Sequence, residues 1–186
     1  MNRREAVQHI ALLLGASMVG ANAMLTGCNS ESGSTTEWKP EEIAYLDEIA
    51  ETILPATSTP GAKAAQVGQF MTVMVNDCYE ERDRKVFREG LDKINKAAKD
   101  KHSNDFMKLN PQQRHDVLVA LDKEQKEHTA NRKDDEAPHY FRMMKELTLL
   151  GYFTSEVGAT QARRHVPNPG RFEGCIPYTK GEKAFA

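Results

Sequence analysis

The chain has few of the residues that build cofactor and metal sites. It contains three cysteines in 186 residues, and none belongs to the Cys-x-x-Cys-His pattern that attaches haem. It has no glycine-rich dinucleotide motif, P-loop or nucleophile elbow. A dinuclear metal bundle needs two Glu-x-x-His motifs, and the one match here, Glu136 to His139, contains Pro138. We therefore expect a chain with no catalytic residues that binds no metal or cofactor of its own.

The chain also lacks an excess of charge. Its 25 Lys and Arg residues against 27 Asp and Glu residues give a formal net charge of -2. No basic field favours nucleic acid as a partner. The histidines are scattered among charged residues, so most are interpreted as solvated surface side chains: His9, His102, His115, His128, His139 and His165.

The N-terminal region lacks a strongly apolar run. A transmembrane helix needs about 20 predominantly apolar residues, whereas Gly, Ser, Asn and Thr dilute the uncharged stretch between Glu5 and Glu31. A cleaved export signal over residues 1–27 fits better. Arg3 and Arg4 ahead of this mild apolar core resemble a twin-arginine signal. That route carries folded proteins, so we expect a cofactor or partner to be assembled before export.

A lipid attachment site is predicted at the end of the signal. Leu25, Thr26 and Gly27 precede Cys28 and resemble a lipobox, in which the cysteine is acylated and becomes the mature N-terminus. The alternative is a plain signal followed by a chance cysteine. Residues 28–37 are small and polar and read as a flexible tether. We expect a periplasmic protein that a lipid anchors to a bacterial membrane.

Helical periodicity organises the rest of the chain. No convincing strand alternation occurs, and from His165 onwards Pro and Gly interrupt every pattern. We predict an all-α fold over residues 38–186, a single bundle of five to six helices with an irregular C-terminal arm. The expected helices cover residues 40–54 and 67–78, a stretch from 111 into the polar segment 123–136, residues 138–150, and a short helix to about 164. A third helix from 81 carries Phe87, Leu91, Ile94 and Ala98 on its apolar face, and its charged run 96–102 is expected to fray.

Two cysteines are left after lipidation. Cys78 and Cys175 could form a disulfide that ties the arm across the second helix. On the chain-entropy model this bridge would stabilise the fold by about 4 to 5 kcal/mol. The alternative is two buried free thiols, because Cys78 falls on the apolar face of its helix.

Two clusters are not required by a helical bundle: residues 53–62 (ILPATSTPGA) and residues 147–175, which include GYFTSE and PGRFEGC. At these residues the chain resembles the gluconate 2-dehydrogenase subunit 3 family, over about residues 43–178. The resemblance implies a non-catalytic small subunit beside a large flavoprotein of the glucose-methanol-choline type, which holds FAD and oxidises a sugar or sugar acid. A cytochrome c with haem c often takes the electrons. This chain departs from the pattern of the family at Ala6 in the signal and in the charged segment 123–135.

The resemblance also answers what the folded cargo would be. The FAD-loaded large subunit would cross the membrane on this chain's signal. We expect the partner interface at large apolar side chains in segments without helical periodicity: Tyr152, Phe153, Pro167, Pro169 and Phe172. The alternative is that these side chains cover the end of the bundle.

Two other functions stay open. A stand-alone lipid-anchored periplasmic binding protein is the main alternative, and a small enzyme in its own right has no residue pattern to support it. A neighbouring gene for a flavin oxidoreductase would favour the interpretation as a dehydrogenase subunit over a stand-alone binding protein.

Overall fold

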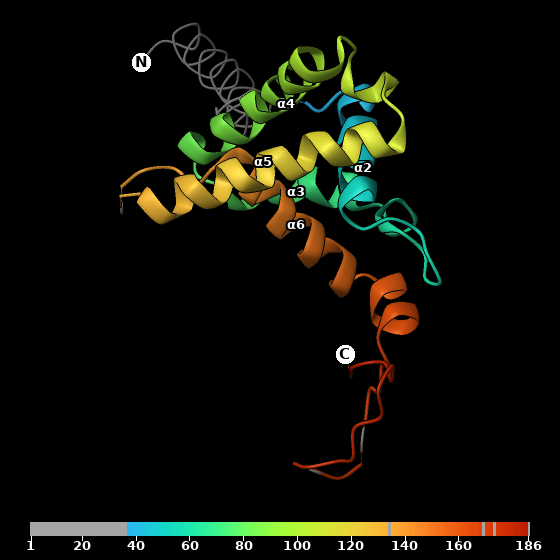
Figure 1. Ribbon diagram of the computed structural model, residues 1–186. Coiled ribbons are helices and arrows are strands. Elements are labelled where there is room, and N and C mark those ends of the chain that lie inside the picture. Colours follow the sequence, from blue (N-terminus) through green and yellow to red (C-terminus); the bar gives the residue numbers. More distant parts are fainter. Residues whose placement is uncertain (1–36, 134, 169, 173, 186) are drawn as a thin grey trace, which may run out of the picture. The chain divides into compact units, whose positions relative to one another are not determined.

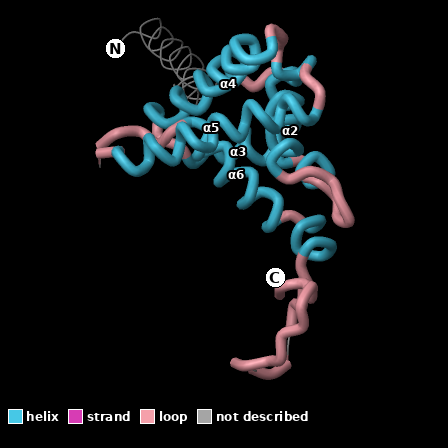
Figure 2. Tube along the Cα trace, in the orientation of Figure 1, coloured by secondary structure: helices cyan, strands magenta, loops and turns pink. Residues whose placement is uncertain are grey.

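The computed structural model describes residues 37–133, 135–168, 170–172 and 174–185 (Figure 1). These residues form no strands, and Figure 2 shows helices followed by a C-terminal segment of loop. The predicted all-α class is confirmed. The α-helices are α2 (Pro40–Ile53), α3 (Val67–Cys78), α4 (Glu81–His102), α5 (Pro111–Asn131) and α6 (Tyr140–Thr154). Short turns are η1 (Ala62–Ala65), η2 (Phe106–Lys108) and the π-helical η3 (Gly158–Ala162).

Local signals in the sequence set where helices begin. At α5 the Asn110 Oδ1 accepts from the Gln113 N–H at 2.9 Å, and the Gln113 Oε1 accepts from the Asn110 N–H at 3.1 Å. This confirms the capping box expected there, with Pro111 at the first helical position. At α2 the Glu42 carboxylate accepts from the Lys39 N–H at 2.8 Å. Each cap satisfies backbone donors that the helix itself leaves unpaired.

Two helices run further than expected. α4 continues through His102, so the expected fraying over residues 96–102 is wrong. Ala98 is fully buried in that stretch and gives the charged turn an anchor in the core. α6 continues through Gly151 and Tyr152, where a break was expected. A Cβ on Gly151 would lie 2.6 Å from the Phe70 ring, so the missing side chain lets α3 and α6 approach closely.

One core joins the helices. Each fully buried large side chain stabilises the fold by about 1.5 to 3 kcal/mol. The largest come from every α-helix and from η2: Leu46, Ile49, Met71, Phe87, Ile94, Phe106, Val117, Phe141 and Met144. The apolar faces predicted from helical spacing are thus the faces that pack together.

The predicted signal and almost all of the tether lie outside the described residues. This holds for Arg3, Arg4, the lipobox and Cys28. None of the described helices is both long and apolar enough to cross a bilayer.

Candidate functional site

The structure brings the two motif clusters into contact. The Tyr152 Oη, on α6, donates a hydrogen bond of 2.6 Å to the backbone oxygen of Pro60, in the loop between α2 and η1. η1 also packs against α6. Residues 53–62 and the start of the 147–175 cluster therefore form one junction, although about ninety residues separate them in the chain.

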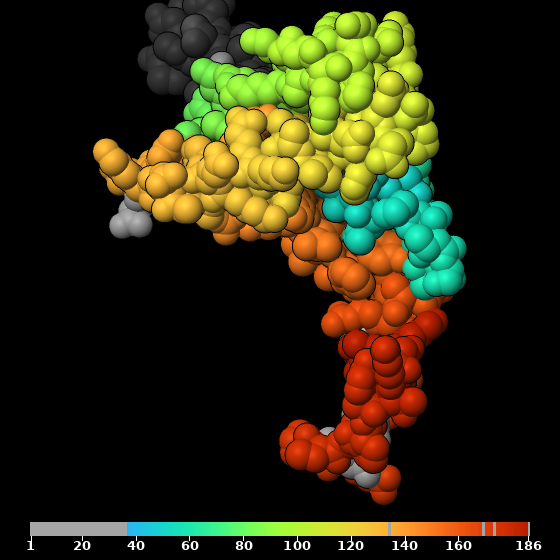
Figure 3. Space-filling view, viewed as in Figure 1, coloured from blue at the N-terminus to red at the C-terminus, as the bar shows by residue number. Residues whose placement is uncertain are grey.

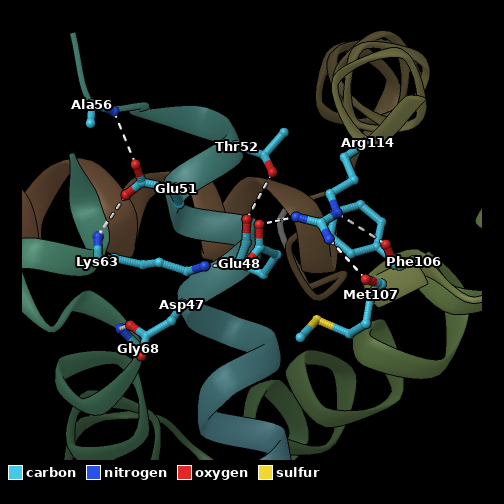
Figure 4. A network of polar contacts seen from close by, with 10 residues as sticks. All are labelled: Asp47, Glu48, Glu51, Thr52, Ala56, Lys63, Gly68, Phe106, Met107 and Arg114. Atoms are coloured by element: carbon cyan, nitrogen blue, oxygen red, sulfur yellow. Dashed lines mark hydrogen bonds and ion pairs between the residues drawn. The ribbon is translucent and has the colours of Figure 1, made fainter. Parts of the chain in front are cut away.

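The loop at this junction is held rigidly on α2 (Figure 4). The Glu51 carboxylate accepts from the backbone N–H of Ala56 and of Lys63, both at 2.9 Å. A Cβ on Gly61 would lie 2.3 Å from the Glu51 Oε1 and 2.6 Å from the Ala56 nitrogen. Glycine is therefore the residue that lets the loop close over this carboxylate.

A second carboxylate on α2 joins three more elements. Glu48 pairs with Lys63 of η1 and with Arg114 of α5 (Figure 4). Arg114 also donates to the Met107 oxygen in η2 at 2.8 Å. The Glu48 and Arg114 side chains are 14% and 15% exposed, and partial burial of a paired charge makes loss of one partner costly. These contacts hold α2, η1, η2 and α5 together around the junction.

The start of α3 is held in the same way. The Asp47 Oδ1 accepts from the Gly68 N–H at 2.7 Å (Figure 4). Burial raises the pKa of the Asp47 carboxyl above its ordinary value, and the Gly68 hydrogen bond opposes that rise.

Tyr152 was expected at a partner interface, and this is wrong. It lies inside α6 and is 4% exposed, with its ring edge-on to Phe153 at 5.1 Å between centroids. Gly151 and Tyr152 continue the helical spacing of the buried face, so Tyr152 belongs to the core and the junction.

The outer face of α6 is apolar over its last turns. Leu149, Leu150 and Phe153 are all exposed, Phe153 by 36%, and their spacing places them on one side of the helix. Nearer the start of α6 the same side carries the Arg142–Glu146 ion pair at 2.8 Å. We call Leu149, Leu150 and Phe153 the α6 apolar face.

The C-terminal arm, residues 163–185, continues from this face. The Arg163 guanidinium lies 5.5 Å from the Phe153 ring centroid. Arg164 closes the arm at its base. Its N–H donates to the Ala184 oxygen at 2.8 Å, its guanidinium pairs with Glu182 at 2.8 Å, and it lies 3.9 Å over the Phe185 ring. The arm is thus a loop with joined ends, standing off the helices in Figure 3.

Large apolar side chains are exposed along this loop. Phe172 is 95% exposed and Tyr178 is 78% exposed, and Ile176 is also open to solvent. Pro167 is exposed, as expected for an interface residue, and Pro169 lies outside the described residues. A few exposed apolar side chains are normal, but aromatics gathered on one loop next to an apolar helix face are typical of a binding surface.

The predicted disulfide is absent from the structure. Cys78 and Cys175 are free thiols and both are exposed, so the alternative of two buried thiols is wrong as well. Cys78 is the last residue of α3, beyond the buried part of its apolar face, with its Sγ 4.0 Å from the Met74 Sδ. Cys175 lies in the arm and is also exposed.

Among the described residues, His139 is the buried histidine, an exception to the interpretation that most histidines are solvated. The His139 Nδ1 accepts from the Phe141 N–H at 3.2 Å and caps α6. Its Nε2 lies 3.6 Å from the Glu124 Oε1, and its ring lies 5.5 Å from the His128 ring. Burial lowers the pKa of His139, with Glu124 acting against it. Its position after Pro138 and before an apolar run is the sequence signal for this role. No three His, Cys, Asp or Glu side chains in the described part of the chain are placed to hold a metal ion.

The helical core, the α6 apolar face and the closed arm define a small all-α domain with large apolar side chains exposed on α6 and the arm. The chain belongs to the gluconate 2-dehydrogenase subunit 3 family, whose model matches residues 40–170. The family comprises the small subunits of gluconate 2-dehydrogenase complexes. Searches of curated proteins and of solved structures gave no match.

Proposed function

We propose that this chain is the non-catalytic small subunit of a periplasmic, membrane-attached dehydrogenase. Its large subunit is a flavoprotein of the glucose-methanol-choline type that holds FAD and oxidises a sugar or a sugar acid. The observation that carries the proposal is the family match over residues 40–170. The matched region contains the junction and the α6 apolar face.

The exposed apolar side chains give this subunit its role. The α6 apolar face with Phe172 and Tyr178 of the arm offers area that water covers in the isolated chain. Burying it against the large subunit favours association. A partner that binds only the folded, FAD-loaded form stabilises that form by mass action.

The N-terminal residues add export and anchoring to the proposal. Arg3 and Arg4 would direct the assembled pair to the twin-arginine route, so that the flavin subunit crosses the membrane folded. Lipid on Cys28 would then hold the complex at the membrane, and residues 28–37 would give it reach. Mass spectrometry of the membrane form should find an acylated cysteine at the mature N-terminus, and an unmodified Cys28 in a soluble product would exclude the anchor.

Co-expression of both subunits tests the export step. Changing Arg3 and Arg4 together to Lys should leave FAD-containing large subunit in the cytoplasm and remove dye-linked sugar oxidation from the periplasm. The control is the same large subunit fused to an independent twin-arginine signal, whose export should not depend on this chain. Unchanged export with the double variant would contradict co-export.

The main alternative is a lipid-anchored binding protein that has no redox partner. Purification from native membranes separates the two functions, because a dehydrogenase subunit brings flavin absorption with it and a stand-alone protein does not. Haem absorption in the same sample would add a cytochrome c as the electron acceptor.

A further inference from the structure

Charge is distributed unevenly between the helices and the arm. Residues 38–162 carry 18 basic and 22 acidic side chains, whereas residues 163–186 carry five basic and two acidic ones. The helical part is thus acidic by four charges and the arm is basic by three. A basic segment on an acidic domain selects partners of negative potential and speeds its encounter with them.

Three of the five basic side chains of the arm line a cavity at its base. This cavity has a volume of about 640 Å³. No acidic residue lines it, and its lining is Thr160, Arg163, Arg164, His165, Pro167 and Lys183. The Arg164 Nε is buried without a hydrogen-bond partner among the described residues, and the Glu182 Oε1 accepts from the Nη1 of the same guanidinium.

We propose that the arm docks on an acidic surface of the large flavin subunit and that a carboxylate-bearing side chain of that subunit enters this cavity. The inference rests on the proposed function and names the chemistry of its interface. Arginine suits a carboxylate because its planar N–H groups match the two oxygens. Phe172 and Tyr178, which are exposed further along the arm, would supply apolar contact in the manner of aromatic anchors at protein interfaces.

The geometry favours a protein over an anionic membrane as the occupant. Segments that lie on membranes are typically amphipathic helices with one apolar face, and the described residues of the arm beyond η3 form no helix. The arm is instead a closed loop, and the cavity that Arg163, Arg164 and Lys183 line is large enough for one side chain. A loop already closed by Arg164 loses less conformational entropy on binding than an open one.

The salt dependence of the complex tests the inference without any variant. The Debye length falls from about 14 Å to about 4 Å between 0.05 and 0.5 M salt. For the detergent-solubilised complex we expect the Kd to rise about tenfold or more over this range. A complex that forms with a Kd independent of salt would overturn the acidic docking surface and leave the proposed function standing. Absence of any complex at low salt would overturn the proposed function itself.

A charge-reversal pair tests the cavity directly. Arg163→Glu with Lys183→Glu should raise the Kd at least about tenfold. The matched control is Lys85→Glu with Lys123→Glu, two exposed lysines on α4 and α5 with the same change of charge, which should shift the Kd less than about threefold. Circular dichroism of the small subunit checks the fold. If the charge-reversal variant changes the circular dichroism spectrum, Arg163→Gln with Lys183→Gln is used instead. The Kd is again expected to rise.

Vesicles test the competing occupant. The full chain with Cys28→Ser, which cannot be acylated there, should not sediment with vesicles of anionic phospholipid at 0.15 M salt. If the chain sediments with these vesicles and Arg163→Glu with Lys183→Glu abolishes the sedimentation, then the arm binds a membrane. That result would overturn the proposal. Equal weakening of the complex by the arm pair and by the α4 and α5 control pair would also overturn it, because net charge alone would then explain the effect.

Discussion

Replacing Tyr152 with alanine should destabilise the chain far more than the same change at Phe153, its neighbour. Tyr152 is 4% exposed and its hydroxyl bonds the Pro60 oxygen, whereas Phe153 is 36% exposed on the outer side of α6. Adjacent aromatic residues on one helix thus have different roles. Tyr152 joins the two motif clusters through its hydrogen bond to Pro60, and Phe153 belongs to the proposed contact surface.

The magnitudes follow from burial. Truncating a buried aromatic side chain costs about 3 to 5 kcal/mol, and the hydrogen bond to Pro60 adds about 1 kcal/mol. Tyr152→Ala should therefore remove about 4 to 6 kcal/mol from a total that is commonly about 5 to 15 kcal/mol. Phe153→Ala leaves no enclosed cavity and should cost about 1 kcal/mol. Tyr152→Phe loses only the hydrogen bond and should also cost about 1 kcal/mol.

Urea unfolding followed by circular dichroism measures these differences. With an m-value of about 2 kcal/mol/M, Tyr152→Ala should lower the midpoint by about 2 to 3 M and Phe153→Ala by about 0.5 M. Complex formation should separate the two variants of similar stability: Phe153→Ala weakens binding of the flavin subunit, and Tyr152→Phe leaves it unchanged. Equal midpoints for the two alanine variants, or a larger loss at Phe153, would refute this division of roles.

Three further results are expected. Gly68→Ala should lower Tm by several degrees, because a Cβ would lie 2.6 Å from the Asp47 Oδ1 and overpacking costs about 1 to 3 kcal/mol. An unchanged Tm would contradict the tight approach of α2 and α3. Lowering the pH below about 6.5 should reduce stability through His139, because its pKa is lowered in the folded chain and the unfolded chain binds the proton first. In His139→Gln the urea midpoint should depend less on pH between pH 7 and 5. An equally steep dependence in that variant would exclude this histidine as the cause. Alkylation of the native protein, followed by peptide mapping, should label Cys78 and Cys175 both, whereas a cross-linked peptide pair would restore the disulfide.

Sequence patterns predicted the helices well where spacing and caps agreed. The capping box of Asn110 and Gln113 located the start of α5, and apolar spacing located α2 and α3. They failed where tertiary contacts decide the outcome. Gly151 has poor helix propensity, but its close approach to Phe70 makes the helix continue there. The charges of residues 96–102 were interpreted as fraying, although Ala98 lies on the predicted buried face and anchors that turn in the core.

The candidate site was predicted in part. The arm and Phe172 lie exposed as expected, because Pro and Gly prevent regular structure after His165. Tyr152 was misplaced because the aromatic pair was read as a break, and the contact of its hydroxyl with Pro60 joins distant parts of the chain. The structure leaves Cys78 and Cys175 as free thiols, and a sequence does not contain the distance between two cysteines. The closed base of the arm likewise depends on contacts that no local pattern encodes.

Association with a flavin subunit is the central claim, and one measurement tests it most directly. The chain is purified from native membranes through a C-terminal affinity tag, and the absorption spectrum and the peptide masses of the eluate are recorded. The account predicts flavin absorption together with one large co-purifying oxidoreductase subunit, in a constant ratio to this chain. Elution of the chain alone, without flavin, would contradict it.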